Sequence, residues 1–510
     1  MLALIMCKTH AFAQTADVYQ KAADGYMDDK NYQQAVDNYT KAIKKNSYDK
    51  IQLSTLYYKR GQCFANLEKT DDALKDYNKA IELNPQSSDA YWGRGVIYDN
   101  DGKYQLSIAD YKTAISLAKG NDINEGLAIL YCNIANNEAA LTNYTEALQA
   151  DSISITLNEQ YSRAYKVRGD IHGAQHNFTA AVDDLTKAIF SYKDDDAKGL
   201  SYIYTDRADA KRNLDKNKDA INDYSMAIKL NPDNGVAYWN RAATYHQNSD
   251  YELAADDYTK AMTFYKDDTK NLSELYDNRA TNELGQTLYT KAISDDSVAI
   301  ALDPANKEAY FTRANAYTQN ADYQLGINDF NKLLTLYTGQ NKALALLHFE
   351  VANNEYFLNE FDKVVDDCTK AIELDPGYSS SYYYRAKVYL KKLDKKDLAI
   401  SDFNKVIALD TSKKTVNYIF SLFYTGKGDD AAAILQNNLL STTDNAVMLA
   451  DYYNLACLYS LMNKPDEANI YLKKAIDNGY AKKYAIADED LDNIRKTDDY
   501  KSTIAGAPGQ

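Results

Sequence analysis

One pattern recurs along almost the whole chain. Residues 231–262 read NPDNGVAYWNRAATYHQNSDYELAADDYTKAM, and closely similar stretches stand at 84–115 and 303–333. Each stretch holds two segments in which apolar or small residues recur at the spacing of one helix face, joined by a short polar turn. A pattern that returns at this period predicts an array of stacked helix pairs, in which each pair packs against its neighbours and not around one central core.

The spacing of the repeats carries a second regularity. A small residue opens each second helix and marks thirteen units between about residues 16 and 476. Up to residue 364 the distance between these anchors alternates between 34 residues and 38 to 40 residues. Four extra residues amount to about one helical turn, which lengthens a helix without rotating its buried face. We therefore expect the extra residues after the second helix of each odd unit, with a pair of repeats as the structural unit. The anchors are Ala35, Ala73, Ser107, Ala147, Ala181, Ala220, Ala254, Ala292, Gly326, Val364, Ala399, about Ala432, and Ala468.

Aromatic and small residues follow one another in a fixed order within each unit, as Tyr238, Ala242, Ala254 and Tyr258 illustrate. Prolines stand after the second helix of even units, at Pro85, Pro232, Pro304 and Pro376. This pattern resembles the tetratricopeptide repeat (TPR) of bacterial proteins, and the resemblance covers nearly the whole chain. It implies an all-α fold, a right-handed α-α superhelix or TPR solenoid.

The same reading divides the chain into three parts. Residues 1–13 are a possible signal peptide, residues 14–476 hold about thirteen tetratricopeptide repeats in alternating long and short pairs, and residues 477–510 form a C-terminal capping helix and tail. A polar terminal helix is expected because the last repeat would otherwise leave its apolar face in water.

Two charged residues occur together in eight of the units. An arginine precedes the small residue of the first helix, and an aspartate precedes the aromatic anchor of the second helix. Where the arginine is replaced by Ala22 or Ile134, the aspartate is missing too, whereas Asp367 stands opposite Val351. Eight similar pairs are not eight active sites, so we expect a structural Arg–carboxylate contact inside each unit. The pairs are Arg60–Asp76, Arg94–Asp110, Arg168–Asp184, Arg207–Asp223, Arg241–Asp257, Arg279–Asp295, Arg313–Asp329 and Arg385–Asp402.

Charge and residue usage exclude several classes of function. The formal net charge of −15 would repel phosphate backbones and anionic lipid, so nucleic acid or a membrane surface is not expected as the main partner. Past the first residues no stretch approaches the roughly 20 apolar residues of a membrane span. The five cysteines are scattered, and His172 and His176 share a helix face without a third ligand, so no metal site is expected. Because no catalytic or nucleotide motif is present, we expect no enzyme and no cofactor.

The amino terminus reads MLALIMCKTHAFAQ, an apolar start followed by Ala11-Phe12-Ala13, which suits a signal peptidase with Gln14 as the first mature residue. No Lys or Arg precedes Leu2 and the apolar run is short, so an ordinary chain end is the alternative. We expect an exported protein, periplasmic or associated with the cell envelope of a bacterium, with a cytoplasmic protein as the alternative.

The resemblance implies a noncatalytic scaffold that binds a partner protein or peptide in a concave groove lined by the first helices. The alternative is a binder of carbohydrate or cell-envelope polymer that uses exposed aromatic rings for stacking. In the family, the position beside the buried opening aromatic, with the position four residues on, often points into the groove. An equally weighted alternative is that these aromatic residues only pad contacts between neighbouring helices. The candidate partner-binding residues are Tyr58, Trp92, Trp239, Phe311, Asn315, Phe349, Asn353 and Tyr383, with the companions Gln62, Val96, Ala243 and Lys387.

Overall fold

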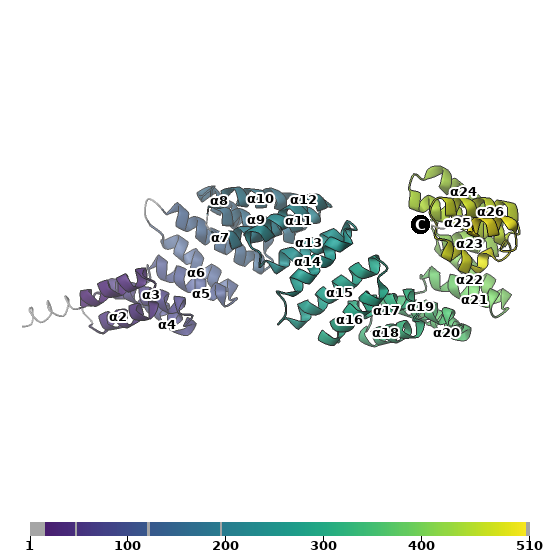
Figure 1. Ribbon diagram of the computed structural model, residues 1–510. Helices are drawn as coiled ribbons and strands as arrows, with labels where there is room; N and C mark the ends of the chain where they lie inside the picture. The colour runs from purple at the N-terminus through teal and green to yellow at the C-terminus, as the bar shows by residue number, and fades with distance from the viewer. Residues whose placement is uncertain (1–15, 46–47, 120–122, 194–195, 506–510) are drawn as a thin grey trace, which may run out of the picture. The chain divides into compact units, whose positions relative to one another are not determined.

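The computed structural model describes residues 16–45, 48–119, 123–193 and 196–505, so the expected signal peptide lies outside the described residues. The described residues form helices joined by turns, and these make two compact units that meet in the sequence between Phe264 and Tyr265 (Figure 1). This confirms the all-α fold of paired helices. The winding of the whole chain into a right-handed superhelix stays a prediction.

Unit 1 holds repeats 1 to 7, numbered along the chain, each made of a first and a second helix. Consecutive helices pack against one another through the unit. Its helices are one over residues 16–28, α2 (Tyr32–Lys44), α3 (Lys50–Asn66), α4 (Thr70–Leu83), α5 (Ser88–Asn100), α6 (Tyr104–Leu117), α7 (Asn124–Ala140), α8 (Tyr144–Leu157), α9 (Ser162–Ala174), α10 (Phe178–Ser191), α11 (Ala197–Arg212), α12 (Asn217–Leu230), α13 (Gly235–Gln247) and α14 (Tyr251–Met262).

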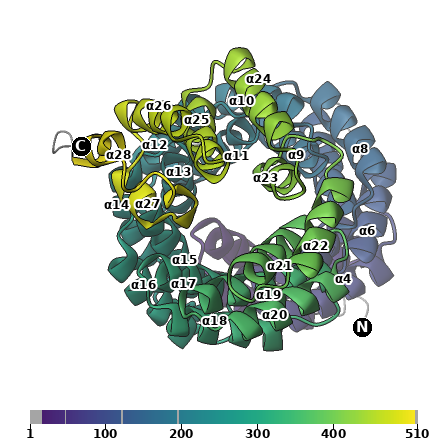
Figure 2. The ribbon, with the colours of Figure 1, turned by 90° about the vertical axis from the view of Figure 1, so that its right-hand side faces the viewer.

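Unit 2 holds repeats 8 to 13 and the C-terminal segment. Figure 2 shows the first helices α15, α17 and α19 on the inner side of the second helices α16, α18 and α20. The helices of unit 2 are α15 (Thr269–Gly285), α16 (Tyr289–Leu302), α17 (Lys307–Gln319), α18 (Tyr323–Leu336), α19 (Asn341–Phe357), α20 (Phe361–Leu374), α21 (Ser379–Lys391), α22 (Lys396–Leu409), α23 (Val416–Tyr424), α24 (Gly428–Ser441), α25 (Asn445–Leu461), α26 (Pro465–Asp477), α27 (Lys482–Ala487), the short 3-10 helix η1 (Glu489–Leu491) and α28 (Asp498–Ala505).

The two repeat lengths have a direct structural counterpart. The first helices of even repeats, α3, α7, α15 and α19, have 17 residues and α11 has 16. The first helices of odd repeats, α5, α9, α13, α17 and α21, have 13 residues. The extra residues therefore add about one turn to every second first helix.

The second helices of even repeats end in one recurring turn. Asn84, Asn231, Asp303 and Asp375 follow the last residues of α4, α12, α16 and α20. Each side-chain oxygen accepts the backbone N–H two residues further on, at 2.9–3.2 Å. Between donor and acceptor stands the proline, which has no N–H to continue the helix.

All eight expected Arg–Asp pairs are present. In each pair, Nε and Nη2 of the arginine donate to the two carboxylate oxygens of the aspartate at 2.6–2.9 Å, which is a bidentate contact. The prediction is confirmed. Asp367, which lacks the arginine, instead lies 2.7 Å from Nδ1 of His348.

The same arginines also tie neighbouring repeats together. Nη1 donates, at 2.6–3.1 Å, to a polar side chain on the second helix of the preceding repeat. One guanidinium thus fixes both the helix pair of its own repeat and the register of that pair on its neighbour. The contacts are Arg60 to Thr40, Arg94 to Asn78, Arg207 to Thr186, Arg241 to Ser225, Arg313 to Ser297 and Arg385 to Thr369.

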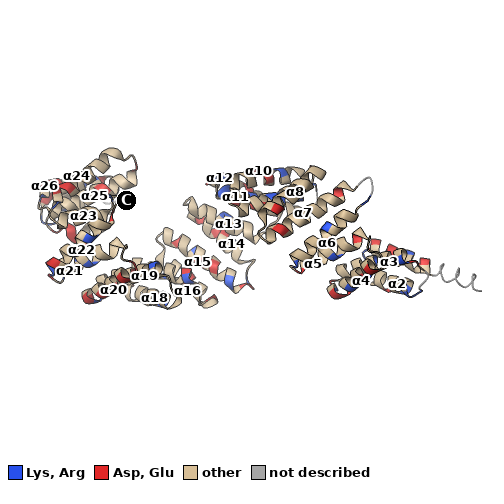
Figure 3. Cartoon of the chain, turned by 180° about the vertical axis from the view of Figure 1, so that it is seen from behind, with Lys and Arg blue, Asp and Glu red and all other residues tan. Residues whose placement is uncertain are grey.

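The C-terminal segment covers the end of unit 2, as the expected cap should. Leu491, Ile494 and Tyr500 are buried in one cluster with Leu455 of α25 and Leu472 of α26. Outside these apolar contacts, acidic and basic residues are interspersed over the helices of both units (Figure 3).

Candidate functional site

The eight candidate partner-binding residues all lie on first helices, and the side chains of seven are half-buried on α3, α5, α13, α17 and α19. The eighth, Tyr383, is half-buried on α21. Half-burial suits either an aromatic groove or padding between neighbouring helices, so the contacts of each residue decide between the two.

Two of the predicted pairs meet in one cavity of unit 1. Tyr58 and Gln62 of α3 and Trp92 and Val96 of α5 line a hollow of about 390 Å³, which we call the α3–α5 hollow. Its other lining residues are Met27, Ala65, Asn66, Tyr77, Gly93 and Ile97. A space of this size is within the range of sites that take a ligand side chain or small molecule.

The floor of the α3–α5 hollow is the ring of Tyr77, a side chain that is 2 % exposed. Gly93 lies so close to this ring that a Cβ there would come within 2.8 Å of its carbon atoms. The ring of Tyr58 stands at 6.1 Å from that of Tyr77, centroid to centroid. Glycine at position 93 therefore lets α5 approach the floor while leaving the space above it open.

The polar groups at the rim of the hollow differ in whether they already form hydrogen bonds within the protein. Nε2 of Gln62 donates to the hydroxyl of Tyr58 at 2.6 Å, and burial raises the pKa of Tyr58 to about 12, so this ring stays neutral. The indole N–H of Trp92 donates to no other residue among those the structure describes. A half-buried ring with an unused donor is a group that a partner can both cover and hydrogen-bond.

Three candidates of unit 2 form packing contacts or hydrogen bonds within the protein itself. Phe311 packs edge-on against Phe330, with ring centroids 6.0 Å apart. Phe349 packs edge-on against two tyrosine rings, Tyr378 and Tyr384, each at 5.5 Å. Asn353 accepts a hydrogen bond from the hydroxyl of Tyr384 at 2.9 Å, which commits its carbonyl oxygen to the protein itself.

Three candidates remain, namely Tyr383, Asn315 and Trp239. Tyr383 packs against Phe403 at 5.9 Å, and Lys387 lies over its ring. Asn315 makes no side-chain hydrogen bond to another described residue. Trp239 lies on α13, outside the α3–α5 hollow. The structure thus brings Tyr58 and Trp92 together around open space, packs Phe311 against one ring and places Phe349 between two.

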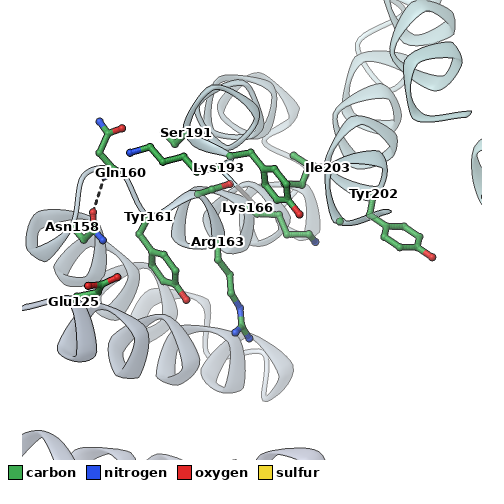
Figure 4. Close-up of a pocket in the computed structure, with 13 residues that line it drawn as sticks. Glu125, Asn158, Gln160, Tyr161, Arg163, Lys166, Ser191, Lys193, Tyr202 and Ile203 are labelled. Carbon is green, nitrogen blue, oxygen red and sulfur yellow. Dashed lines mark hydrogen bonds between the residues drawn. The ribbon is translucent and has the colours of Figure 1, made fainter. Parts of the chain in front are cut away.

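A larger hollow in unit 1 was not expected from the sequence. It has about 620 Å³ and lies between the turn before α9 and the first turns of α11 (Figure 4). We call it the α9–α11 hollow. It is lined by Glu125, Asn158, Gln160, Tyr161, Ser162, Arg163, Lys166, Ser191, Tyr192, Lys193, Gly199, Tyr202 and Ile203. The extra turn of the longer helix α11 provides Gly199, so the alternation of helix lengths is the sequence signal that could have indicated this place.

The cationic groups of the α9–α11 hollow do not converge. Figure 4 shows Lys193 directed toward Gln160, whereas Arg163 extends to another side together with Tyr161. Lys166 pairs with Asp170 at 2.7 Å and with Asp206 at 3.0 Å. The hollow therefore offers dispersed polar groups and tyrosine rings, and not a focused anion site.

Two buried aspartates replace the aromatic anchor of the second helix. Asp151 of repeat 4 and Asp296 of repeat 8 are fully buried, and none of their carboxylate oxygens has a hydrogen-bond partner among the described residues. Burial raises the pKa of Asp151 to about 7, and burial together with the charge of Asp277 raises the pKa of Asp296 to about 10. The sequence shows an acidic residue at a position that is aromatic in other repeats, but no buried acid was predicted from it.

Within the described ranges no helix is both long and apolar enough to cross a membrane. Over the same residues, no group of three or more His, Cys, Asp or Glu side chains is placed to hold a metal ion.

Family comparisons agree with the helix pairs. Tetratricopeptide repeat models match residues 54–87, and also 88–121, 307–338 and 452–478. A further model described as a TPR repeat matches residues 208–249. All of these models describe noncatalytic repeats.

Relatives and solved structures of the same class are distant. A TPR repeat-containing protein of Methanocaldococcus jannaschii is 24% identical over 80% of this chain and 73% of its own length. The human mitochondrial import receptor subunit TOM70 is 21% identical over 86% of this chain and 78% of its own. The crystal structure of YrrB, a TPR protein with an unusual peptide-binding site, aligns with 39% of this chain and 95% of its own, at 20% identity and a TM-score of 0.31. Over the stretches that these models match, the chain thus consists of tetratricopeptide repeats.

Proposed function

We propose that this protein is a noncatalytic scaffold that binds a partner protein or peptide on the inner face of its first helices, with the α3–α5 hollow as the principal site. The observation that carries the proposal is that Tyr58, Gln62, Trp92 and Val96, chosen from the repeat register alone, line one open space. The partner of a repeat scaffold is set by such local sites and not by the fold.

The chemistry of the hollow favours an extended peptide that inserts an apolar side chain. Val96, Ile97 and Met27 provide apolar walls, and the ring of Tyr77 provides the floor. The indole N–H of Trp92 is then available for a backbone carbonyl of the peptide. An aromatic anchor at the centre of a desolvated pocket is the arrangement in which single residues dominate binding energy.

The test is partner capture from an extract of the native cell with the full chain as bait. Trp92→Ala should lower the recovery of the specific partner at least tenfold, because it removes both the ring and the donor. Phe190→Ala is the matched control, since Phe190 is an aromatic residue of the same unit that is 87 % exposed and lies outside the hollow. Equal capture by both variants would place the partner elsewhere.

The second candidate function is binding of a carbohydrate or cell-envelope polymer. The α9–α11 hollow supports it, because its lining combines the rings of Tyr161 and Tyr202 with the polar side chains of Asn158 and Gln160. Retention on insoluble glycan that is lost in Tyr202→Ala and kept in Trp92→Ala would favour this function. Capture of a partner protein that is lost in Trp92→Ala and kept in Tyr202→Ala would favour the peptide scaffold.

We also propose that the protein is exported in a bacterium and cleaved after Ala13. The proposal is supported by the apolar start and the Ala-Phe-Ala sequence. Mass spectrometry of the protein from its native cell should then find Gln14 as the first residue. An intact Met1 on cytoplasmic protein would reject export.

A further inference from the structure

The C-terminal segment places two acidic side chains on a row of lysines that lies two repeats earlier. Asp490 of η1 forms ion pairs with Lys391, and with Lys387 at 3.7 Å. Glu489 accepts a hydrogen bond from Lys392 at 2.6 Å. These contacts join residues 97 to 103 positions apart in the sequence, across the span of repeats 11 to 13.

The lysines form one site on the C-terminal end of α21. Lys387 and Lys391 stand four residues apart and share a helix face, and Lys392 follows directly after the helix. Tyr383 lies one turn earlier on that face, with the ammonium of Lys387 6.0 Å from its ring centroid. We call these four residues the α21 lysine site. Tyr383 and Lys387 are one of the pairs that the repeat register assigns to the groove.

The acidic segment is held in a defined backbone conformation. The side chain of Asp488 accepts a hydrogen bond from the hydroxyl of Tyr453 at 2.8 Å and another from the backbone N–H of Asp490 at 2.9 Å. Nη2 of Arg495 donates to the carbonyl oxygen of Asp488 at 2.8 Å. The segment therefore lies on the α21 lysine site as a bound peptide would, with an ordered backbone and its carboxylates on the cations.

Capping of the last repeat does not require these ion pairs. The residues that cover the apolar end of unit 2 are Leu491, Ile494 and Tyr500, which belong to the buried cluster. The side chain of Glu489 is 46 % exposed, and its pair with Lys392 lies at the surface, where an ion pair contributes little. Exchange of these acids for equivalent acids of another chain keeps the lysines paired, so its free-energy cost is that of ordering the incoming peptide and of releasing the hydrogen bonds of Asp488.

We propose that the α21 lysine site binds an acidic peptide segment of a partner protein, and that residues 488–490 are an internal occupant which such a segment replaces. The site lies in unit 2 and uses charge, so it is independent of the apolar α3–α5 hollow. Its partner should present two adjacent carboxylates, as Glu489 and Asp490 do, and should bind less tightly as the salt concentration rises.

The probe is a fluorescent peptide with the sequence of residues 482–497, titrated with the full chain and followed by anisotropy. The wild-type chain should bind it weakly, and the variant Glu489→Gln/Asp490→Asn should bind it at least tenfold more tightly. Adding Lys391→Ala to that variant should remove the gain. A peptide carrying the same two amide substitutions is the matched control and should not bind.

The milder variant Glu489→Gln keeps the buried Asp490 and should bind the peptide about threefold more tightly than the wild type. Circular dichroism establishes that each variant is folded. If the folded double variant binds the peptide no better than the wild type, residues 488–490 are a fixed cap and the proposal is wrong. If the double variant does not fold, an unchanged affinity of Glu489→Gln overturns the proposal in the same way.

Discussion

Repeats 2 and 3 of unit 1 and repeats 10 and 11 of unit 2 carry aromatic residues at the same positions of their first helices. Tyr58 and Trp92 border an open hollow, whereas Phe349 is enclosed by other rings. The difference arises one residue further along. In repeat 3 that residue is Gly93, and in repeat 11 it is Tyr384, whose ring packs on Phe349 and whose hydroxyl donates to Asn353.

The comparison teaches that the groove position alone does not decide whether a repeat binds or packs. The neighbouring position fills or empties the space between two first helices. An aromatic groove residue beside a small residue is a candidate for binding, and one beside a large residue is a candidate for packing. Four experiments test how the two units differ.

The largest effect concerns the buried acids, one in each unit. Burial raises the folded-state pKa of Asp296 to about 10, above its value in the unfolded chain. The stability that comes from binding this proton is therefore fully present below the unfolded pKa and is lost as the pH rises toward 10. Relative to Asp296→Asn, the wild type should lose about 4 kcal/mol of unfolding free energy between pH 6 and pH 9, at 1.36 kcal/mol per pH unit.

Asp151 in unit 1 should show a smaller effect in the same experiment. Its pKa of about 7 confines most of the loss to pH values below 8, so the difference between wild type and Asp151→Asn should change by about 1.4 kcal/mol over the same range. Denaturant titrations at both pH values measure both differences. Equal changes for the two variants would contradict the expectation that Asp296 is more strongly desolvated than Asp151.

The next effect tests the filled face of unit 2. Tyr384→Ala removes the ring that packs on Phe349 and Tyr356, together with the hydroxyl bonded to Asn353. We expect the free energy of unfolding to fall by about 3 kcal/mol, as for other large-to-small changes among packed aromatic residues. Chemical denaturation measures the loss. A loss well below 1 kcal/mol would contradict the assignment of this face to packing.

A smaller effect tests the open face of unit 1. Gly93→Ala puts a methyl group against the ring of Tyr77, where a Cβ comes within 2.8 Å. The gain in helix propensity is up to about 1 kcal/mol, and overpacking costs about 1 to 3 kcal/mol, so we expect a net loss of about 1 kcal/mol. The same variant should weaken partner binding, because the displaced ring enters the hollow. Gly126→Ala is the control, since its Cβ would meet no atom within 4 Å.

The smallest effect separates two amides at the same groove position. Asn353→Ala leaves the half-buried hydroxyl of Tyr384 without its acceptor and should cost about 1 kcal/mol of stability. Asn315→Ala removes no hydrogen bond among the described residues and should change stability by less than about 0.5 kcal/mol. If partner binding depends on either amide, we expect it to depend on Asn315. Thermal unfolding and capture assays on both variants measure this.

The helix pairs, the alternation of lengths and the Arg–Asp contacts could be predicted because each is written into a short stretch of sequence. Arg313 and Asp329, for example, occupy fixed places in one repeat, and their joint presence in eight repeats marks the contact. The fold of every repeat follows from the same local periodicity.

The sites depend on contacts that no single repeat encodes. The α3–α5 hollow needs the volumes of Trp92 and Gly93 on α5 and of Tyr77 on α4, which belong to two different repeats. The ion pair of Lys391 with Asp490 joins residues 99 positions apart, in a segment where the repeat has ended. Helical periodicity predicts neither the hollow nor the ion pair, because it indicates which helix face is buried and not which side chains fill the space next to that face.

The alternation of helix lengths has a consequence for how a partner is read. Because every second first helix is one turn longer, the edge of a unit is notched, and the notch returns once per pair of repeats. A partner whose own motif recurs at that period can engage several notches in succession. Each further engagement is then intramolecular, so weak single contacts add up to strong and length-dependent attachment.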